Sequence, residues 1–161
     1  DKMVDIKEKI REGWLHVNFI IEVLGKPADY IEKVLDLAVD KLGKEKNIEL
    51  INKKVHEAKS VEKEKTSVFT TFAEIEILVP SLFRVVDIIF DYMPSSVEIV
   101  DPSNINLKLE DANALLNDLA TRLHQYDAIS KRLRLERDIL IKKLNLNNEY
   151  RTRNNEFRSS S

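Results

Sequence analysis

Apolar residues recur at every second position in several stretches of the chain, and this spacing is typical of β-strands with one buried face. The first stretch, residues 14–25, is expected to bury one alternating set of side chains: Leu15, Val17, Phe19, Ile21 and Val23. Residues 47–58 and 66–79 also alternate. They flank the polar stretch "KSVEKEK" (59–65), which predicts an antiparallel hairpin with that stretch as its connection. A fourth, short strand is predicted at residues 95–100.

Between these strands, apolar residues recur with the 3.6-residue spacing of amphipathic helices. Residues 3–12 predict a short N-terminal helix that ends before Gly13, and residues 27–43 predict a second helix with Gly43 as its cap. The expected buried stripe of the second helix is Tyr30, Val34, Leu37, Ala38 and Leu42. A third helix is predicted at residues 82–93, with the buried stripe Leu82, Val85, Val86, Ile89 and Phe90.

The order of these elements predicts an α+β fold, a ferredoxin-like βαββαβ sandwich. Its four-stranded antiparallel sheet is expected to carry both helices on one face. We assign this domain to residues 13–103, after an N-terminal amphipathic helix in residues 1–12. The stretch "DYMPSSVEIVDPSN" (91–104) contains two of the four prolines and is interpreted as a corner of the fold rather than an active-site loop.

From Leu109 onward the apolar spacing becomes a strict alternation of three and four, which is the heptad pattern of a coiled coil. Residues 104–148 are therefore predicted to form a long coiled-coil helix, and they contain no Gly or Pro. The seam of this helix is the expected oligomer interface and comprises Leu109, Ala112, Leu116, Leu119, Leu123, Tyr126, Leu133, Leu140 and Leu144. Two further seam positions are polar, Ser130 and Arg137. Such positions cost stability but restrict register and partner number.

The length of this helix indicates that it needs a partner. The 36 residues from 109 to 144 would form a helix of about 54 Å. A domain of about 100 residues is only about 33 Å across. Pairing with a second copy of the chain, in a homodimer, is the favoured interpretation. The alternative is an amphipathic helix that folds back onto the open face of the sheet.

Composition narrows the class of protein. The chain of 161 residues is 43% hydrophobic and 34% charged, which is typical of a folded protein. No apolar run approaches the ~20 residues needed to cross a membrane, so a membrane is not expected as a partner. Cysteine is absent, which excludes disulfides, thiolate metal sites and cysteine nucleophiles, and a cytoplasmic location is expected.

Charge is distributed unevenly along the chain. Residues 128–158 contain nine basic and four acidic side chains, so this segment is +5 and the remainder is −7. The segment could contact nucleic-acid phosphates, through candidates Lys131, Arg132, Arg134, Lys142 and Lys143. Alternatively, it is a solvated helix whose cations complement the C-terminal dipole, which is the favoured interpretation. Residues 149–161 are expected to form a polar basic tail, and its end, "EFRSSS", has the composition of an appended cloning remnant.

A metal site can be drawn on the sheet face turned away from the helices. His16 and His56 would join Glu74 and Glu76 as two imidazole and two carboxylate ligands. The alternative is a solvated face with ordinary cross-strand pairs, such as Lys54 with Glu74. The glutamate strand is expected to lie between the two histidine strands, so the ligands would have to reach diagonally. We therefore expect no metal and no other cofactor.

Catalytic motifs are also missing from the sequence. The three glycines are not clustered as a phosphate-binding loop requires, and the serines lack a G-x-S-x-G elbow. The sequence thus favours a non-catalytic scaffold or adaptor that binds a protein partner and self-associates through its C-terminal helix. An RNA- or ribosome-associated factor that uses the basic segment is the alternative. An enzyme or small-ligand sensor comes third.

Overall fold

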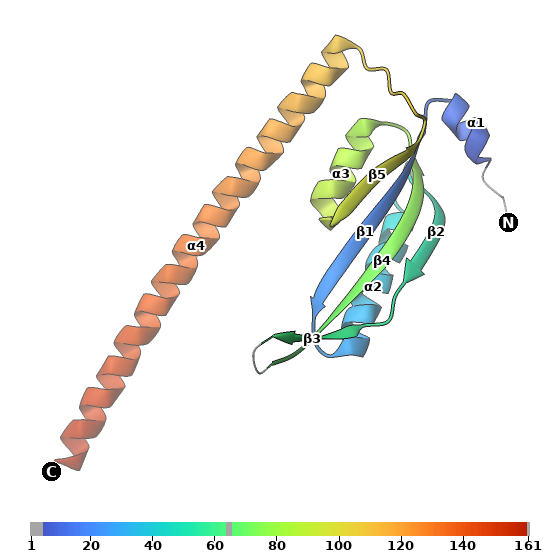
Figure 1. The fold of residues 1–161 in the computed structure, drawn as a ribbon. Helices are drawn as coiled ribbons and strands as arrows, with labels where there is room; N and C mark the ends of the chain where they lie inside the picture. Colours follow the sequence, from blue (N-terminus) through green and yellow to red (C-terminus); the bar gives the residue numbers. More distant parts are fainter. Residues whose placement is uncertain (1–4, 64–65, 161) are drawn as a thin grey trace. The chain divides into compact units, whose positions relative to one another are not determined.

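The computed structural model describes residues 5–63 and 66–160. The chain divides into two compact units, Asp1–Lys108 and Leu109–Ser161. Figure 1 shows the first unit as a sheet with helices and the second as a single helix. In chain order the elements are α1 (Ile6–Arg11), β1 (Leu15–Gly25), α2 (Ala28–Gly43), β2 (Glu49–Val55), β3 (Lys59–Lys63), β4 (Thr66–Val79), α3 (Leu82–Tyr92), β5 (Ser96–Asp101) and α4 (Leu109–Ser159).

The sheet of the first unit has the strand order β2-β4-β1-β5, with β3 paired to β4 beside this path. Every pair of neighbouring strands is antiparallel. The two long strands β1 and β4 pair from Leu15 opposite Val79 to Gly25 opposite Phe69. The structure therefore confirms an α+β fold with an antiparallel sheet and a long C-terminal helix.

The polar stretch 59–65 is only partly the connection that the sequence predicts. Residues 59–63 form β3, which pairs with the first part of β4 and places Val61 opposite Val68. The hydrogen bonds of such a ladder come from the backbone, so polar side chains do not prevent it. A lysine-rich sequence also suits a strand at the margin of a sheet. The prediction that this whole stretch is a connection was wrong, because the polarity of its side chains was given more weight than the capacity of its backbone to pair.

The hydrophobic core lies on one face of the sheet, where α2 and α3 both pack. Four of the five residues predicted to be buried on β1 are buried: Leu15, Val17, Phe19 and Ile21. The fifth, Val23, is half-buried against the same cluster. On α3, Val85 and Val86 are buried as predicted, and Ile88 joins them. The period of two in the strands therefore identified the core face correctly.

The buried stripe of α2 is not the predicted one. Its buried residues are Ile31, Leu35, Val39 and Leu42. Of the predicted stripe, Leu42 is buried and Ala38 half-buried, whereas three residues are exposed: Tyr30, Val34 and Leu37. Apolar residues cover a wide arc of this helix, so spacing alone allows two neighbouring stripes. Core packing favours one of them, because Leu35 and Val39 join the buried cluster. On the outer side of the helix, Lys53 Nζ of β2 binds Asp36 and Asp40 at 3.1 and 2.5 Å.

The segment between α3 and β5 is a corner tied to the sheet. Met93 ends α3 in the left-handed conformation, with φ 48°, and its backbone N–H donates to the carbonyl of Ile89. Ser95 then donates twice to the carbonyl of Ile20 on β1, from its backbone N–H at 2.7 Å and from its hydroxyl at 3.2 Å. These contacts turn the chain directly into β5, which pairs with β1.

The first helix, α1, is short and capped. The carboxylate of Asp5 accepts a hydrogen bond from the backbone N–H of Glu8 at 3.1 Å. The chain leaves the helix at Gly13, whose φ of +97° favours glycine. The first two residues of the predicted helix, 3 and 4, lie outside the described residues.

The second unit is the single helix α4, which contains 51 residues. At 1.5 Å per residue its length is about 76 Å. It begins at Leu109 rather than residue 104 and continues to Ser159, so residues 149–159, expected as a polar tail, are helical. No Gly or Pro interrupts this stretch, and a polar sequence contains no signal that would end a solvated helix.

Candidate interaction surfaces

The predicted seam of α4 is exposed. The structure describes every residue of this helix, and none of them is buried. The large apolar seam residues are between 55% and 78% exposed: Leu109, Leu116, Leu123, Tyr126, Leu133, Leu140 and Leu144. Ala112, Leu119 and Ser130 are partly exposed, and Arg137 is exposed. Monomeric proteins rarely leave so long a row of apolar side chains in water, so this row is the leading candidate interaction surface.

The geometry of the seam is that of a supercoil. A heptad repeat drifts by about 20° per heptad around a straight α-helix, so the seam rotates by about 100° between residues 109 and 144. Two helices with such seams stay in contact by winding around each other with a left-handed twist. The row therefore suits a partner that is itself a long helix.

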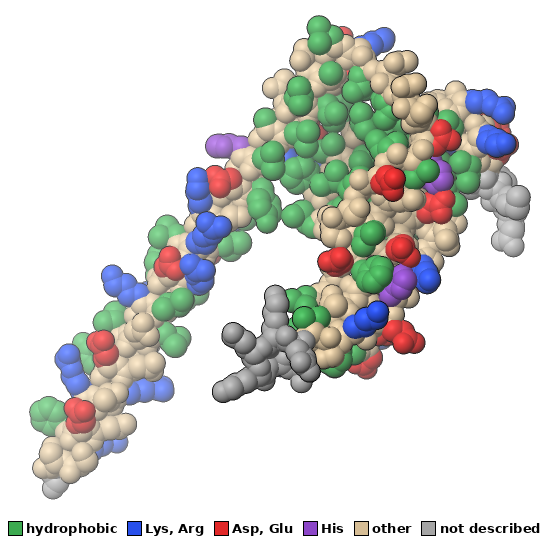
Figure 2. Space-filling view, in the orientation of Figure 1, with side chains coloured by type: hydrophobic (Ala, Val, Ile, Leu, Met, Phe, Trp, Pro, Cys, Tyr) green, Lys and Arg blue, Asp and Glu red, His purple; other side chains and the backbone are tan. Residues whose placement is uncertain are grey.

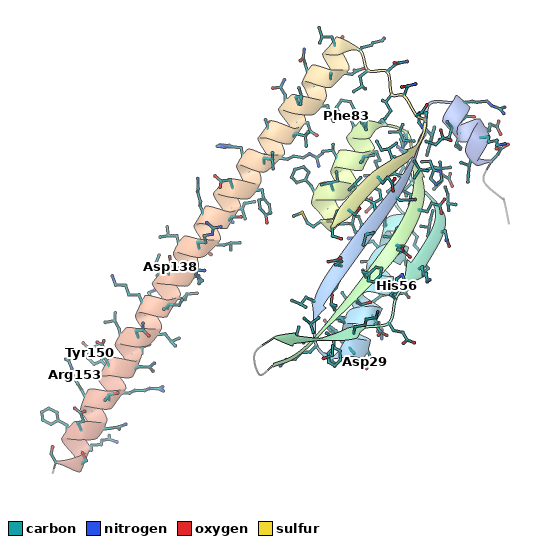
Figure 3. The ribbon with its side chains drawn as sticks, in the orientation of Figure 1. Asp29, His56, Phe83, Asp138, Tyr150 and Arg153 are labelled. Carbon is teal, nitrogen blue, oxygen red and sulfur yellow. The ribbon has the colours of Figure 1, made fainter. Side chains whose placement is uncertain are left out.

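A second apolar stripe on α4 was missed by the sequence reasoning. Its members are spaced four, seven, four and seven residues apart: Leu135, Ile139, Leu146, Tyr150 and Phe157. This is an 11-residue repeat, which stays on one face of a nearly straight helix. Figure 3 labels Tyr150 on this stripe. At 100° per residue the stripe lies about 130° around the axis from Leu133, Leu140 and Leu144. A search for an 11-residue period as well as a heptad would have found it.

The candidate nucleic-acid contacts also lie on α4, and all five are exposed. Figure 2 shows Lys and Arg side chains on both sides of the C-terminal part of the helix. Two of the five pair within the helix, Lys131 with Asp127 at 2.7 Å and Arg132 with Glu136 at 3.9 Å. The hydrogen bond from Lys131 holds the pKa of Asp127 below its usual value. At 100° per residue the five cations spread over about half of the helix circumference, on the side away from the seam, rather than forming one narrow stripe.

A shallow cavity of about 350 Å³ lies on the open face of the sheet, opposite the helices. Side chains from all four strands of the main path line it: Asn18, Asn52, Lys54, Glu74, Glu76, Ser96 and Glu98. Lys54 lies directly opposite Glu74 in the register of β2 and β4, as the sequence predicts. Within the described residues, no buried side-chain nitrogen or oxygen atom lacks a hydrogen-bond partner. Three carboxylates against one ammonium group make this face acidic.

The histidines of this face form two separate pairs. His16 Nε2 lies 2.6 Å from Glu76 Oε1, and His56 Nε2 lies 3.0 Å from Glu74 Oε2. His56, labelled in Figure 3, also stacks on Phe72 with ring centroids 4.0 Å apart. As expected, β4 with both glutamates lies between β1, which carries His16, and β2, which ends just before His56. Among the side chains that the structure describes, which leave out residues 62–67, no three His, Asp or Glu group as a metal ion requires. The four-ligand site drawn from the sequence is therefore not assembled.

A polar network on the other face ties α3 to the loop after α2. Glu45 accepts hydrogen bonds from Arg84 at 2.6 Å and from Tyr92 at 2.5 Å, and Arg84 also donates to the carbonyl of Lys46. Burial raises the pKa of Glu45, but the hydrogen bonds from Tyr92 and Arg84 outweigh it and bring the pKa below its usual value. Burial and the bond to Glu45 raise the pKa of Tyr92. These partners are far apart in sequence, so no motif predicted them.

Comparison with known proteins gives one match. The profile described as the MJ0538 family matches residues 16–153, which include most of the sheet unit and most of α4. Neither a search of curated proteins nor a search of solved structures found a match. None of the helices in the described part of the chain has the length and apolar character that a membrane span requires.

Proposed function

The chain belongs to the MJ0538 family, and we propose that it is a non-catalytic, cytoplasmic interaction protein that self-associates through the seam of α4. The observation that carries this proposal is the exposed heptad row on a helix of 51 residues with no buried position. The region shared with the family continues to residue 153. The long helix therefore belongs to the family's common region rather than being an appendage of this chain.

The energetics support pairing. Complete burial of a Leu side chain contributes about 1.5–3 kcal/mol. Seven large apolar seam residues in each chain remain more than half exposed, so covering them in a dimer contributes roughly 10–20 kcal/mol for the pair. Association costs about 4–15 kcal/mol in lost translational and rotational freedom, plus side-chain ordering. The apolar seam is thus large enough to outweigh these costs, even with Ser130 and Arg137 within it.

We also propose that residues 13–103 form a ferredoxin-like domain. The strand order β2-β4-β1-β5 and the packing of α2 and α3 on one face support this assignment. In this interpretation β3 is an addition that extends the hairpin with β4. Such a fold has many functions, so the assignment does not by itself specify an activity.

The test compares two variants that each replace two leucines of α4 by alanine, at different positions. The seam variant carries Leu116→Ala and Leu133→Ala, and the control carries Leu135→Ala and Leu146→Ala on the second stripe. All four leucines are exposed, and Ala favours a helix, so far-UV circular dichroism should not change in either variant. By sedimentation equilibrium, the seam variant should raise the dimer dissociation constant at least ~100-fold and the control less than ~10-fold. Equal effects of the two variants, or a monomeric parent chain, would contradict the proposal.

RNA binding is a second candidate function, favoured by the +5 charge of residues 128–158 on an exposed helix. Cations spread over half of the circumference of a helix suit a phosphate backbone less well than one narrow stripe does. The intrahelical pairs of Lys131 and Arg132 also reduce the free positive charge. We therefore place this function second, and the salt dependence of RNA affinity tests it.

A further inference from the structure

The α4 helix carries opposite net charges in its N-terminal 19 residues, called its acidic half below, and in its C-terminal 32 residues, called its basic half. Residues 109–127 contain Glu110, Asp111, Asp118 and Asp127 against Arg122, a net charge of −3. Residues 128–159 have a net charge of +5. We propose that two copies of the chain pair their α4 helices antiparallel, with the acidic half of each against the basic half of the other. This inference rests on the proposed self-association through α4 and specifies the arrangement of the partner.

The charges decide between the two possible directions. In a parallel, in-register pair, the −3 halves would lie side by side and the +5 halves would lie side by side. Charges of the same sign repel when two helices hold them side by side, and complementary charge fixes how two partners align. In an antiparallel pair centred at residue 128, residues 109–128 (net charge −3) lie against residues 128–147 of the second copy (net charge +4). Complementary charge therefore favours the antiparallel direction where the two helices overlap.

The polar seam positions also favour the antiparallel direction. A parallel pair places Arg137 against Arg137 of the second copy, with two guanidinium groups at the centre of one layer. In an antiparallel pair, each layer of the seam joins one residue from each copy, and the two residue numbers add up to the same total in every layer. The alignment centred between Leu123 and Tyr126 places Arg137 against Ala112 and Ser130 against Leu119. A small Ala leaves room for the Arg stem, and the guanidinium group can then extend to solvent. Shifting the alignment by one heptad, to a centre at residue 128, places Arg137 against Leu119 of the second copy. The two Arg137 side chains again lie in different layers.

Distances between spin labels test the direction, because the chain contains no cysteine that would have to be removed. Three single-cysteine variants of the full chain are labelled: Ala114→Cys, Gln125→Cys and Asn145→Cys. All three positions are exposed, uncharged and outside the seam. In the antiparallel pair, the rise of 1.5 Å per residue predicts separations of about 30–40 Å at position 114 and about 50–60 Å at position 145. Position 125 lies near the centre and should give about 20 Å or less.

A parallel pair gives about 20 Å or less at all three positions, since helix axes in contact are only about 8–10 Å apart. That result would overturn the antiparallel arrangement and leave self-association intact. A short distance at position 114 or 145, alone or beside a long one, would also overturn it. Absence of any intermolecular dipolar signal would contradict both the arrangement and the proposed function.

Salt provides an independent readout on the parent chain. Attraction between opposite halves is screened by salt, so the antiparallel dimer should dissociate more readily as ionic strength rises. Screening would instead strengthen a parallel dimer, in which like halves repel. A dimer dissociation constant that falls as salt increases from low to physiological concentration would therefore contradict the antiparallel arrangement.

Discussion

The network around Glu45 leads to a stability prediction that can be worked out from its contacts. Glu45 and Arg84 side chains are 24% and 18% exposed, and Glu45 accepts from both Arg84 and Tyr92. Glu45→Gln keeps the shape of the side chain but removes its charge. A hydrogen bond to a charged group contributes about 1.5–3 kcal/mol, so we expect the free energy of unfolding at pH 7 to fall by about 2 kcal/mol.

The pH dependence has a defined sign. Glu45 has a pKa below its usual value in the folded protein. Its ionised form therefore stabilises the fold above the unfolded-state pKa, and this contribution is lost as pH falls through the folded-state pKa. The difference between the parent chain and Glu45→Gln should be largest at neutral pH and should shrink below about pH 4.5.

Urea unfolding at fixed protein concentration, followed by the fluorescence of the single tryptophan, Trp14, measures these differences. Glu57→Gln, at an exposed carboxylate in the same unit, is the control and should change stability by less than ~0.5 kcal/mol. Tyr92→Phe, combined with Glu45→Gln in a double-mutant cycle, should show coupling. The reasoning would be refuted if Glu45→Gln matched its control at pH 7, or if its effect increased toward acid pH.

Three further predictions follow from other parts of the structure. Leu35→Ala should lower the free energy of unfolding by about 2–5 kcal/mol, and Leu37→Ala by less than ~1 kcal/mol, because Leu35 is buried and Leu37 exposed; equal losses in urea unfolding would contradict the packing of α2. His16→Ala and His56→Ala should each shift the melting temperature by only a few degrees, and a chelator should have no effect; stoichiometric zinc or manganese after dialysis would overturn this. RNA should not bind appreciably at physiological salt. Five phosphate contacts on a single strand would give a slope near −3.5 in a plot of log affinity against log salt. Tight binding with that slope, abolished by Glu substitutions at three of the five candidate cations, would favour the RNA-binding function instead.

The strands of the first unit were predictable because their period-two pattern identifies a buried face directly. The buried faces of β1 and β4 follow from that alternation alone. The rotation of α2 was not predictable, since apolar residues occupy a wide arc and only packing against the sheet selects one of two stripes. The end of α4 was missed because polar helices and polar tails have similar compositions.

The candidate surfaces were predictable only where their residues are close in sequence. The heptad seam is a local pattern, so its residues could be named before the structure was known. The network of Glu45, Arg84 and Tyr92 joins positions 39 and 47 residues apart, and only the fold brings them together. The His–Glu pairs lie between these cases. Their strands were predicted, but the choice of one glutamate by each histidine depends on the register of β4.

The molar mass of the full chain in solution tests self-association most directly. Light scattering should give twice the 18.7 kDa of one chain, and this value should stay constant between about 10 and 100 μM. Self-association through α4 also predicts that a chain ending at Ser103 has the mass of a monomer at the same concentrations. A full chain that remains at 18.7 kDa at about 100 μM would contradict the proposed function.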